Sequence, residues 1–401
     1  MNVTKPDIYK PPHVHYIIEN QLNPGLDRIV VSNTDPLLSL AELYNQELLR
    51  VKTVANFIIV TRDSDEKQCY HEEDVIKVNI LSPAGDQLET EIKETKDGKY
   101  TVTYIPQCVG QHRVEIQVNG QPVTGSPWVV QVIPHQYQFA FTFGSKGNEQ
   151  GQFDIPWGIA VNDKSRTLAV ADVNNKRVQM FGFDGNFLRE RALEAKTSSV
   201  AFTESGDLLS FVACEDNKLP LYTEGGQFIR YISDEHVKTP LHISVVSDGR
   251  IITCDREKEK TINVLSPDGK NLLQSFSAPG CDEYPWCAVY QQNKIFVSYL
   301  NADRVMVFDN AGEYLYDIGS EGTGDGQFSG PTGLAIDKFN RLIVCDAGNR
   351  RLQLFTLDGK YVAKVAGSFF DHNSHLLGCA VSNTGHLFVT DSNNYCIYVF
   401  N

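Results

Sequence analysis

The sequence lacks several features that would place it in a familiar functional class. No apolar run approaches the roughly 20 residues that a membrane-spanning helix requires, and the first residues, MNVTKPDIYKPPHVHY, lack the apolar core of a signal peptide. The 36 basic residues are outnumbered by 50 acidic ones, which gives a formal net charge of −14. This balance argues against a protein that coats DNA or an anionic membrane through bulk charge. We therefore expect neither DNA nor a membrane as a partner.

Cysteine pairs of the C-x-x-C type are also missing. The nine cysteines are odd in number, so neither a disulfide framework nor a zinc knuckle is supported. Cys214, Cys254, Cys345 and Cys379 lie in strand-like apolar runs, where we expect them to be small core residues. Reduced cysteines without a secretion signal predict a cytoplasmic protein.

What the sequence does contain is a repeat. Four segments place a proline directly before an apolar strand, and two further copies keep the strand without the proline. The copies recur about every 42 to 46 residues, which is the interval of a four-stranded propeller blade. The segments are IPWGIAV, TSSVAF, TPLHISV, YPWCAV, GPTGLAI and LLGCAV.

Most copies continue with a second strand, a polar loop, a third strand and a glycine turn. Glycine at the second position of such a turn allows the positive φ that a tight hairpin between antiparallel strands requires. Each repeat is therefore predicted to be a small antiparallel sheet. The turns are Asp184-Gly185, Gly225-Gly226, Asp268-Gly269, Ala311-Gly312 and Asp358-Gly359.

The last copy is one strand short, because the sequence ends at Asn401 directly after its third strand. The run YQFAFTF, residues 137–143, precedes the first copy and belongs to no repeat. Pairing this run with CIYVF would complete the last blade and leave the ring without an open edge. The sequence thus predicts a six-bladed propeller over residues 134–401, closed by the strand 137–143.

The repeat resembles a known family. The pattern G-x-x-G-x-x-x-G-Q-F-x-x-P-x-G-I-A-V, followed by V-A-D-x-x-N-x-R-V-Q-x-F-x-x-D-G, is similar to the NHL repeat. The copies at residues 144–187 and 319–359 match it nearly throughout, whereas Leu219 and Thr261 occupy the arginine position in two degraded copies. Because blade packing needs the pattern rather than identical residues, degraded copies still predict blades.

Residues 34–133 have a different texture, with alternating segments and turns about every ten residues, which is typical of a small β-sandwich. The run DGKYTVTYIPQCVGQHRVEIQVNGQPVTGSPWVVQV resembles the end of a filamin-type immunoglobulin repeat. Residues 1–33 are interpreted as a linker. The predicted fold class is all-β: a filamin-type immunoglobulin β-sandwich followed by a six-bladed NHL β-propeller.

This order of domains resembles the C-terminal part of the tripartite-motif (TRIM) NHL proteins, most of all their mRNA-repressing heterochronic branch. In that family a RING, B-boxes and a coiled coil normally precede the pair, and full-length members include E3 ubiquitin ligases. The cysteine and histidine spacings of those zinc modules are absent here. We therefore expect no ligase activity from this chain, and without a coiled coil we expect a monomer.

Candidate catalytic groups are few. No G-x-S-x-G elbow, phosphate-binding glycine loop or H-E-x-x-H motif is present, and two isolated histidines, His242 and His375, are a weak metal signal. Four acids end equivalent second strands, either as a carboxylate ring or as hydrogen-bond acceptors for loop amides; their recurrence favours the second interpretation. We expect no enzyme activity, no metal and no cofactor. The acids are Asp172, Asp255, Asp346 and Asp391.

Cations and flat rings are predicted to gather on one face of the propeller, which we call the top face. It carries the loops between blades and the loops between second and third strands. Guanidinium and ammonium groups bind phosphates and aromatic rings stack on unpaired bases, and the resemblance implies RNA binding on this face. The candidate RNA-binding residues are Trp157, Lys176, Arg177, Lys218, His242, Lys258, Lys260, Trp286, Arg304, Arg350, Arg351 and Tyr395.

A structural role is the alternative for part of this set. Arg177, Arg304 and Arg351 occupy the repeat's own arginine position, where they would bridge blades, and both tryptophans would pack the mouth of the channel. The predicted function is an RNA-recognition module of a post-transcriptional repressor, acting in translational repression or mRNA decay on hairpin or single-stranded segments of mRNA. The rival is a protein-interaction scaffold or a ubiquitin-ligase substrate-recognition module. Protein partners of the filamin domain fit either function.

Overall fold

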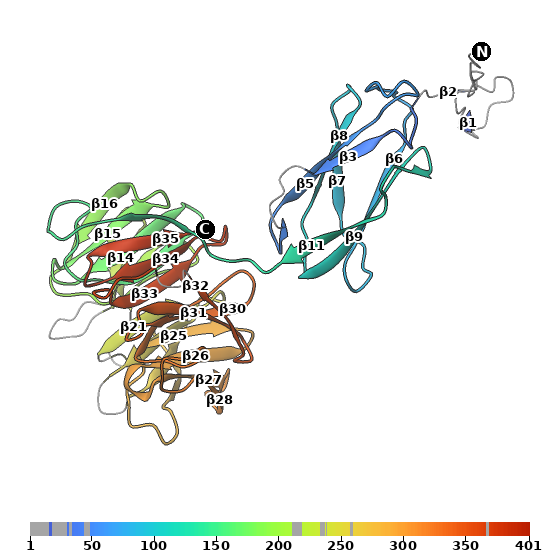
Figure 1. Ribbon diagram of the computed structural model, residues 1–401. Helices are drawn as coiled ribbons and strands as arrows, with labels where there is room; N and C mark the ends of the chain where they lie inside the picture. The colour runs from blue at the N-terminus through green and yellow to red at the C-terminus, as the bar shows by residue number, and fades with distance from the viewer. Residues whose placement is uncertain are drawn as a thin grey trace, which may run out of the picture. The chain divides into compact units, whose positions relative to one another are not determined.

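The computed structural model describes residues 16–17, 30–31, 34–43, 49–210, 219–232, 237, 239–256, 260–365 and 369–401. The chain divides into two compact units, Met1–Gln136 and Tyr137–Asn401 (Figure 1). The interpreted linker, residues 1–33, lies outside the described residues except for β1 (Tyr16–Ile17) and β2 (Val30–Val31), which pair with each other. None of the described residues belongs to a helix that is long and apolar enough to cross a membrane.

The first unit is a sandwich of two sheets. Its strands alternate in burial, as in β8, where Tyr100, Val102 and Tyr104 are buried and the residues between them are not. Inward-facing side chains of both sheets, Phe57 and Ile116 among them, form one apolar cluster. One sheet orders β3 (Leu40–Leu43), β5 (Ala55–Val60), β8 (Lys99–Tyr104) and β7 (Thr90–Glu94). The other contains β6 (Ile76–Leu81), β9 (Gly110–Val118), β10 (Gln121–Pro122), β11 (Trp128–Ile133) and β4 (Leu49–Arg50), with β11 and β4 parallel.

The second unit contains six four-stranded antiparallel sheets, which we number as blades one to six. Blade one is β13 (Pro156–Asn162), β14 (Thr167–Asp172), β15 (Arg177–Gly182) and β16 (Phe187–Ala192). Blade two is β17 (Val200–Phe202), β18 (Leu208–Ser210), β19 (Leu219–Tyr222) and β20 (Phe228–Ile232). Blade three is β21 (Pro240–Val245), β22 (Ile251–Asp255), β23 (Ile262–Leu265) and β24 (Leu272–Phe276).

Blades four to six follow the same order along the chain. Blade four is β25 (Cys287–Gln291), β26 (Lys294–Tyr299), β27 (Arg304–Asp309) and β28 (Tyr314–Ile318), with the short 3₁₀ turn η1 (Leu300–Ala302) between β26 and β27. Blade five is β29 (Pro331–Ile336), β30 (Arg341–Asp346), β31 (Arg351–Thr356) and β32 (Tyr361–Val365). Blade six takes β33 (Leu376–Val381), β34 (Leu387–Asp391) and β35 (Cys396–Phe400) from the end of the chain.

The fourth strand of blade six comes from the start of the unit. β12 (Phe139–Phe143) pairs antiparallel with β35, with Thr142 opposite Tyr398. In Figure 1 the green β12 segment accordingly runs beside the red strands of the chain end. This arrangement gives blade six four strands from two distant parts of the sequence. The prediction of an all-β fold with a filamin-type sandwich and a six-bladed propeller is confirmed.

The glycine turns after the third strands have the backbone that the sequence requires. Gly185 and Gly359 have φ values of 79° and 90°, a region that other residues rarely enter. In the same two blades, the second and third strands are almost wholly buried, because each blade is covered on both faces by its neighbours. The rigid inner strands therefore leave only the loops to vary in chemistry.

Candidate nucleic-acid interface

One backbone position recurs on the top face. A residue one or two positions before the third strand is in the left-handed region in five blades, with φ between 49° and 55°. Such a backbone costs about 1–2 kcal/mol for a residue with a side chain, and glycine would avoid that cost. Each of these five blades therefore presents one side chain from the same strained turn. The residues are Lys176, Lys260, Asp303, Arg350 and Tyr395.

Two of these side chains are exposed cations. Lys176 and Arg350 make no side-chain hydrogen bond or ion pair within the described parts of the chain, and both are exposed. Lys260 differs, because its Nζ lies 2.7 Å from Asp282 Oδ1 and this ion pair raises the pKa of Lys260. The geometry therefore leaves Lys176 and Arg350 available for a ligand, while Lys260 is already paired. Lys218 and Lys258, also candidates, lie outside the described residues.

Arg177 and Arg351 have a different environment from the lysines beside them. The Arg351 guanidinium bonds to Asp346 Oδ2 at 2.7 Å and to the carbonyl oxygens of Thr323, Gly324 and Gln327. Arg177 bonds in the same way to Asp172 Oδ2, at 2.8 Å, and to the carbonyl oxygens of Glu149 and Gln152. Both arginines are less than 10% exposed. Their donors are committed to holding the loop that enters each blade, so we leave them out of the proposed ligand contacts.

Arg304 is the third repeat arginine, and it is held less tightly. Its Nη1 lies 3.0 Å from Asp317 Oδ2 and its Nε donates to the carbonyl oxygen of Ala302. The side chain stays 43% exposed, so part of the guanidinium faces solvent. Arg304 pairs with a residue of its own blade, β28, and remains within reach of a ligand.

The four acids that end the second strands are hydrogen-bond acceptors for loop amides, as the sequence interpretation favoured. Each accepts from the backbone N–H that lies one or two residues before the inner strand of its own blade. Asp172 accepts from Asp154, Asp255 from Thr239, Asp346 from Ser329 and Asp391 from His375, at 2.7 to 3.1 Å. All four are buried. This interpretation is confirmed, and the acids are structural parts of blades one, three, five and six.

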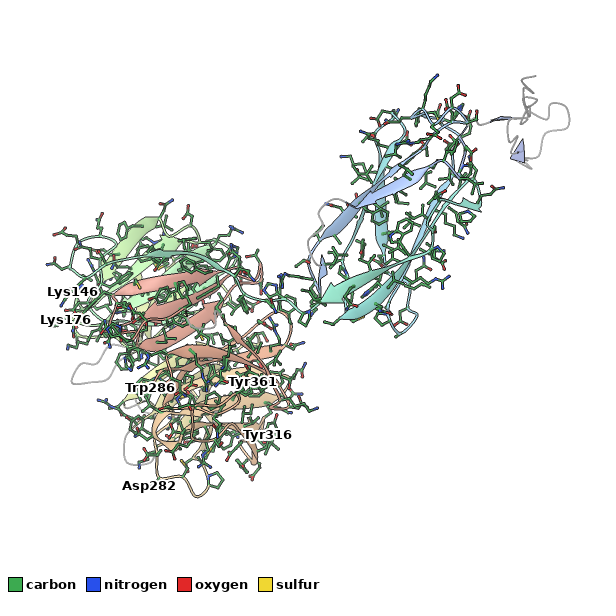
Figure 2. The ribbon with its side chains drawn as sticks, in the orientation of Figure 1. Lys146, Lys176, Asp282, Trp286, Tyr316 and Tyr361 are labelled. Carbon is green, nitrogen blue, oxygen red and sulfur yellow. The ribbon has the colours of Figure 1, made fainter. Side chains whose placement is uncertain are left out.

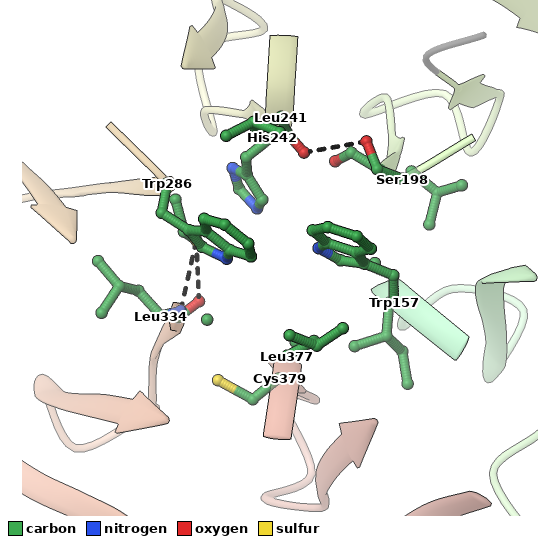
Figure 3. A pocket seen from close by; sticks show the side chains of 15 residues that line it. Trp157, Ser198, Leu241, His242, Trp286, Leu334, Leu377 and Cys379 are labelled. Atoms are coloured by element: carbon green, nitrogen blue, oxygen red, sulfur yellow. Dashed lines mark hydrogen bonds between the residues drawn. The ribbon is translucent and has the colours of Figure 1, made fainter. Parts of the chain in front are cut away.

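The mouth of the central channel is closed by two stacked indoles. The rings of Trp157 and Trp286 are nearly parallel, at 16°, with centroids 5.3 Å apart, and Figure 3 shows them facing each other across the channel. The pocket that they line has a free volume of about 20 Å³, which is room for about one water molecule. A nucleotide-sized ligand therefore fits the loops around the mouth but not this closed channel.

The position after Trp157 shows how the channel wall is built. Gly158 lies so close to blade two that a Cβ would be 2.6 Å from the carbonyl oxygen of Ser198. Blade three has His242 at this position, and its Nδ1 accepts from the Ala288 N–H of the next blade at 3.4 Å. Burial lowers the pKa of His242 to about 4, so the ring is neutral at pH 7 and adds no positive charge to the face.

This histidine predicts a pH dependence of stability. An unfolded chain protonates His242 near its ordinary pKa of about 6.5, whereas the folded protein does so only near 4. The unfolded state therefore binds more protons between these values, and stability falls as pH falls from 6.5 to 4. Over this range, we expect the free energy of unfolding of the unaltered protein to fall by up to about 3 kcal/mol more than that of the His242→Asn variant. Urea titrations of both proteins over this range measure the difference, and a pH-independent difference would contradict it.

The sequence interpretation missed two cations, Lys146 and Lys196. Lys146, in the loop 144–153, is exposed and places its Nζ 4.9 Å above the centroid of the Tyr395 ring. The loop of Lys146 meets the turn of Lys176, because Asn175 Nδ2 donates to the carbonyl oxygen of Gly147 at 2.8 Å, and Figure 2 labels both lysines on the propeller. The sequence did contain a signal for Lys146: the third residue of the loop is lysine in GSKG but glutamate in the matching GSEG of blade five. Lys196 adds a further cation, with its Nζ 2.8 Å from Asn174 Oδ1.

A metal site is not found where the structure can be examined. Among the described residues, no three His, Cys, Asp or Glu side chains are grouped closely enough to bind a metal ion. His375, the second histidine considered, bonds through Nδ1 to Ser392 Oγ at 3.0 Å.

Comparison with known families agrees with both halves of the fold. Residues 34–129 match the filamin/ABP280 repeat. Residues 153–181 match the NHL repeat, and residues 288–372 match a six-bladed β-propeller family. A solved structure of a protein of unknown function from Bacteroides thetaiotaomicron superposes over 90% of this chain and 99% of its own, with a TM-score of 0.63 and 15% identity. That likeness concerns the fold alone.

Two curated relatives point to one group of proteins. E3 ubiquitin-protein ligase TRIM71 of Mus musculus is 32% identical over 139 residues, which cover 33% of this chain and 16% of that protein. Protein lin-41 of Caenorhabditis elegans is 31% identical over 120 residues, covering 28% of this chain and 10% of that protein. The matched region is thus a small part of either relative. These matches show that the chain joins a filamin repeat to an NHL propeller and is related to the tripartite-motif NHL proteins.

Proposed function

We propose that the top face of the propeller binds RNA and that the chain is the RNA-recognition part of a cytoplasmic repressor of messenger RNA. The observation that carries this proposal is the pair of exposed cations on left-handed turns, Lys176 and Arg350, together with the exposed Lys146 in the loop that Asn175 contacts. Ammonium and guanidinium groups on rigid loops suit phosphates that follow one another along a strand. Repression of the bound message would then depend on protein partners, which the filamin unit is suited to recruit.

The distribution of charge supports RNA binding at a local surface and not through the net charge of the whole chain. The chain has a net charge of −14, so an RNA strand would be repelled from most of the surface and attracted only where cations outnumber acids. The closed channel mouth restricts a ligand to the loops. A strand lying over the loops would contact successive blades, each through its left-handed residue.

The first test is charge reversal on the top face. We expect the double variant Lys176→Glu and Arg350→Glu to bind RNA at least about tenfold more weakly at low salt, because phosphate contacts are lost and repulsion replaces them. Its melting temperature should stay within about 2 °C, since neither side chain has a partner in the described structure. Fluorescence anisotropy with RNA selected from a random pool, at two salt concentrations, measures the affinity.

A matched control has the same change of charge elsewhere. Lys360 lies directly before the outer strand β32 and pairs with Asp358. Lys364 lies on β32 and pairs with Asp325. Reversing both should leave RNA affinity nearly unchanged. Equal weakening in the two double variants would show a nonspecific effect of net charge, and a parallel loss of stability in the first would show that Lys176 and Arg350 are structural.

A protein ligand is the second candidate, and one observation favours it. The relative from Mus musculus is named as an E3 ubiquitin-protein ligase, and Asp282, Asp303 and Glu321 place acids among the cations of the face. A propeller in such a ligase would recognise substrates through this mixed surface. If no RNA is enriched from the random pool and binding is lost at moderate salt, the propeller belongs to this class.

A further inference from the structure

Two groups of residues on the top face share the same backbone conformation but carry formal charges of opposite sign. We call seam 6/1 the group Lys146, Lys176 and Tyr395, where the loop 144–153 passes from blade six to blade one. Seam 4/5 is the equivalent group at the entry to blade five, which consists of Glu321, Arg350 and Asp303. Two lysines give seam 6/1 a formal charge of +2, whereas two acids and one arginine give seam 4/5 a charge of −1.

The loops that form the two seams are rigid in the same way. In the loop 144–153, the Phe153 N–H donates to the carbonyl oxygen of Ser145 at 2.8 Å, and the Phe153 side chain is fully buried. The loop 319–328 repeats this with Phe328 and Ser320, also at 2.8 Å. The buried repeat arginines then fix the carbonyl oxygens of both loops. Lys146 and Glu321 are therefore presented by equivalent rigid scaffolds, and only their chemistry differs.

Tyr395 supports the lysine of seam 6/1. Its ring is half-buried against the cluster that contains Phe153, and the Lys146 ammonium lies 4.9 Å above its centroid. A cation over an aromatic face is attracted to it and loses side-chain freedom. Tyr395 therefore holds Lys146 in place, which is a different role from stacking on a base. At seam 4/5 the equivalent residue is Asp303, whose Oδ1 accepts from the Gly330 N–H at 2.7 Å.

We propose that seam 6/1 is the site at which the RNA backbone is anchored, with Lys146 and Lys176 binding phosphodiester groups and Tyr395 positioning Lys146. This inference rests on the proposed function and deepens it, because it assigns the phosphate contacts to one side of the ring. The acids of seam 4/5 repel the same backbone and weaken the contact that Arg350 makes there, so the strongest phosphate contacts lie over blades six and one. Lys196, over blade one, extends the cationic path.

The test compares single charge removals by their salt dependence. The probe is a labelled single-stranded RNA pool of about 20 nucleotides with random sequence. We expect Lys146→Gln to weaken binding about threefold to tenfold and to lower the slope of log K against log salt by about 1. Lys360→Gln removes the same charge from the glycine turn before the outer strand β32, where Lys360 pairs with Asp358, and should leave the slope unchanged. Loss of slope in both variants, or in neither, overturns the inference.

The positioning role of Tyr395 has its own readout. Tyr395→Phe keeps the ring and should retain wild-type affinity, whereas Tyr395→Leu should lose as much affinity as Lys146→Gln. The double variant of Tyr395→Leu and Lys146→Gln should be no weaker than either single variant, because both act on the same contact. If Tyr395→Leu does not fold, the phenylalanine variant and Lys146→Gln still decide. Additive losses would show that Tyr395 contacts the RNA independently and overturn its positioning role.

Two further outcomes separate this inference from the proposed function. Absence of RNA binding by the unaltered protein would remove both. If the double variant Lys176→Glu and Arg350→Glu weakens RNA binding but Lys146→Gln does not, the proposed RNA recognition stands and the anchoring role of seam 6/1 is overturned. Polyglutamate of similar length, added as a competitor, distinguishes an acidic protein ligand: competition equal to that of RNA would assign the seam to such a partner instead.

Discussion

Replacing Arg351 with methionine is expected to lower the free energy of unfolding by about 3–5 kcal/mol, the range for breaking one partner of a buried ion pair. The substitution leaves Asp346 Oδ2 without its closest cation and removes the arginine donor from three loop carbonyls, of which those of Gly324 and Gln327 keep a second donor. Burial already raises the pKa of Asp346, so this carboxylate depends on its donors to remain charged. Chemical unfolding monitored by circular dichroism measures the loss.

The adjacent residue supplies the control for this prediction. Arg350→Met removes the same charge and nearly the same volume one position away, from an exposed side chain. We expect it to change the free energy of unfolding by less than about 0.5 kcal/mol. RNA affinity should respond in the opposite order, with an effect of Arg350→Met in a fully folded protein. Equal destabilisation by the two variants would mean that Arg351 contributes through exposed charge alone.

Removing β12 is expected to have the larger effect on the propeller. A chain that starts at Gly144 loses the fourth strand of blade six and leaves the backbone groups of β35 without partners. It also loses Phe143, which packs 5.0 Å from the Phe181 ring, and Phe139, which lies 6.0 Å from the Phe400 ring. Burial of these aromatic side chains is worth roughly 5 kcal/mol or more. We expect loss of cooperative unfolding and aggregation at the exposed edge.

A chain that starts at Tyr137 is the matched comparison, because it lacks the first unit but keeps β12. It should unfold cooperatively, with a melting temperature close to that of the same unit in the full protein. Size-exclusion chromatography and calorimetry of the two truncated chains distinguish them. Similar cooperative melting of both would show that the ring does not need this strand.

Much of the fold was accessible from the sequence because it depends on local patterns. Glycine turns, alternating strands and a period of 42 to 46 residues are properties of short segments. The filamin-type sandwich was recognisable from one continuous run, and its family match covers residues 34–129. The role of the four second-strand acids was also predictable, because recurrence at the same place in four blades favours a structural role.

The site was less predictable, since it depends on contacts between distant segments. Arg350 and Arg351 are neighbours in sequence, yet one is exposed and the other is buried against a loop more than 20 residues away. The stacking of Trp157 on Trp286 requires the ring to close, because the two residues are 129 positions apart. Lys146 was overlooked because its significance comes from the ring of Tyr395 beneath it. Lys218 and Lys258 remain predictions.

The left-handed turn before the third strand, seen in five blades of the described chain, has a consequence for how such a face can diversify. Its backbone is fixed by the strands on either side, and the position already carries lysine, arginine, aspartate and tyrosine in one chain. A single codon change there alters the chemistry of one sector of the surface while the hydrogen bonds of the blade remain the same. In each of these blades, one surface residue can therefore be exchanged while the fold stays the same, so new ligand preferences can arise without a new fold.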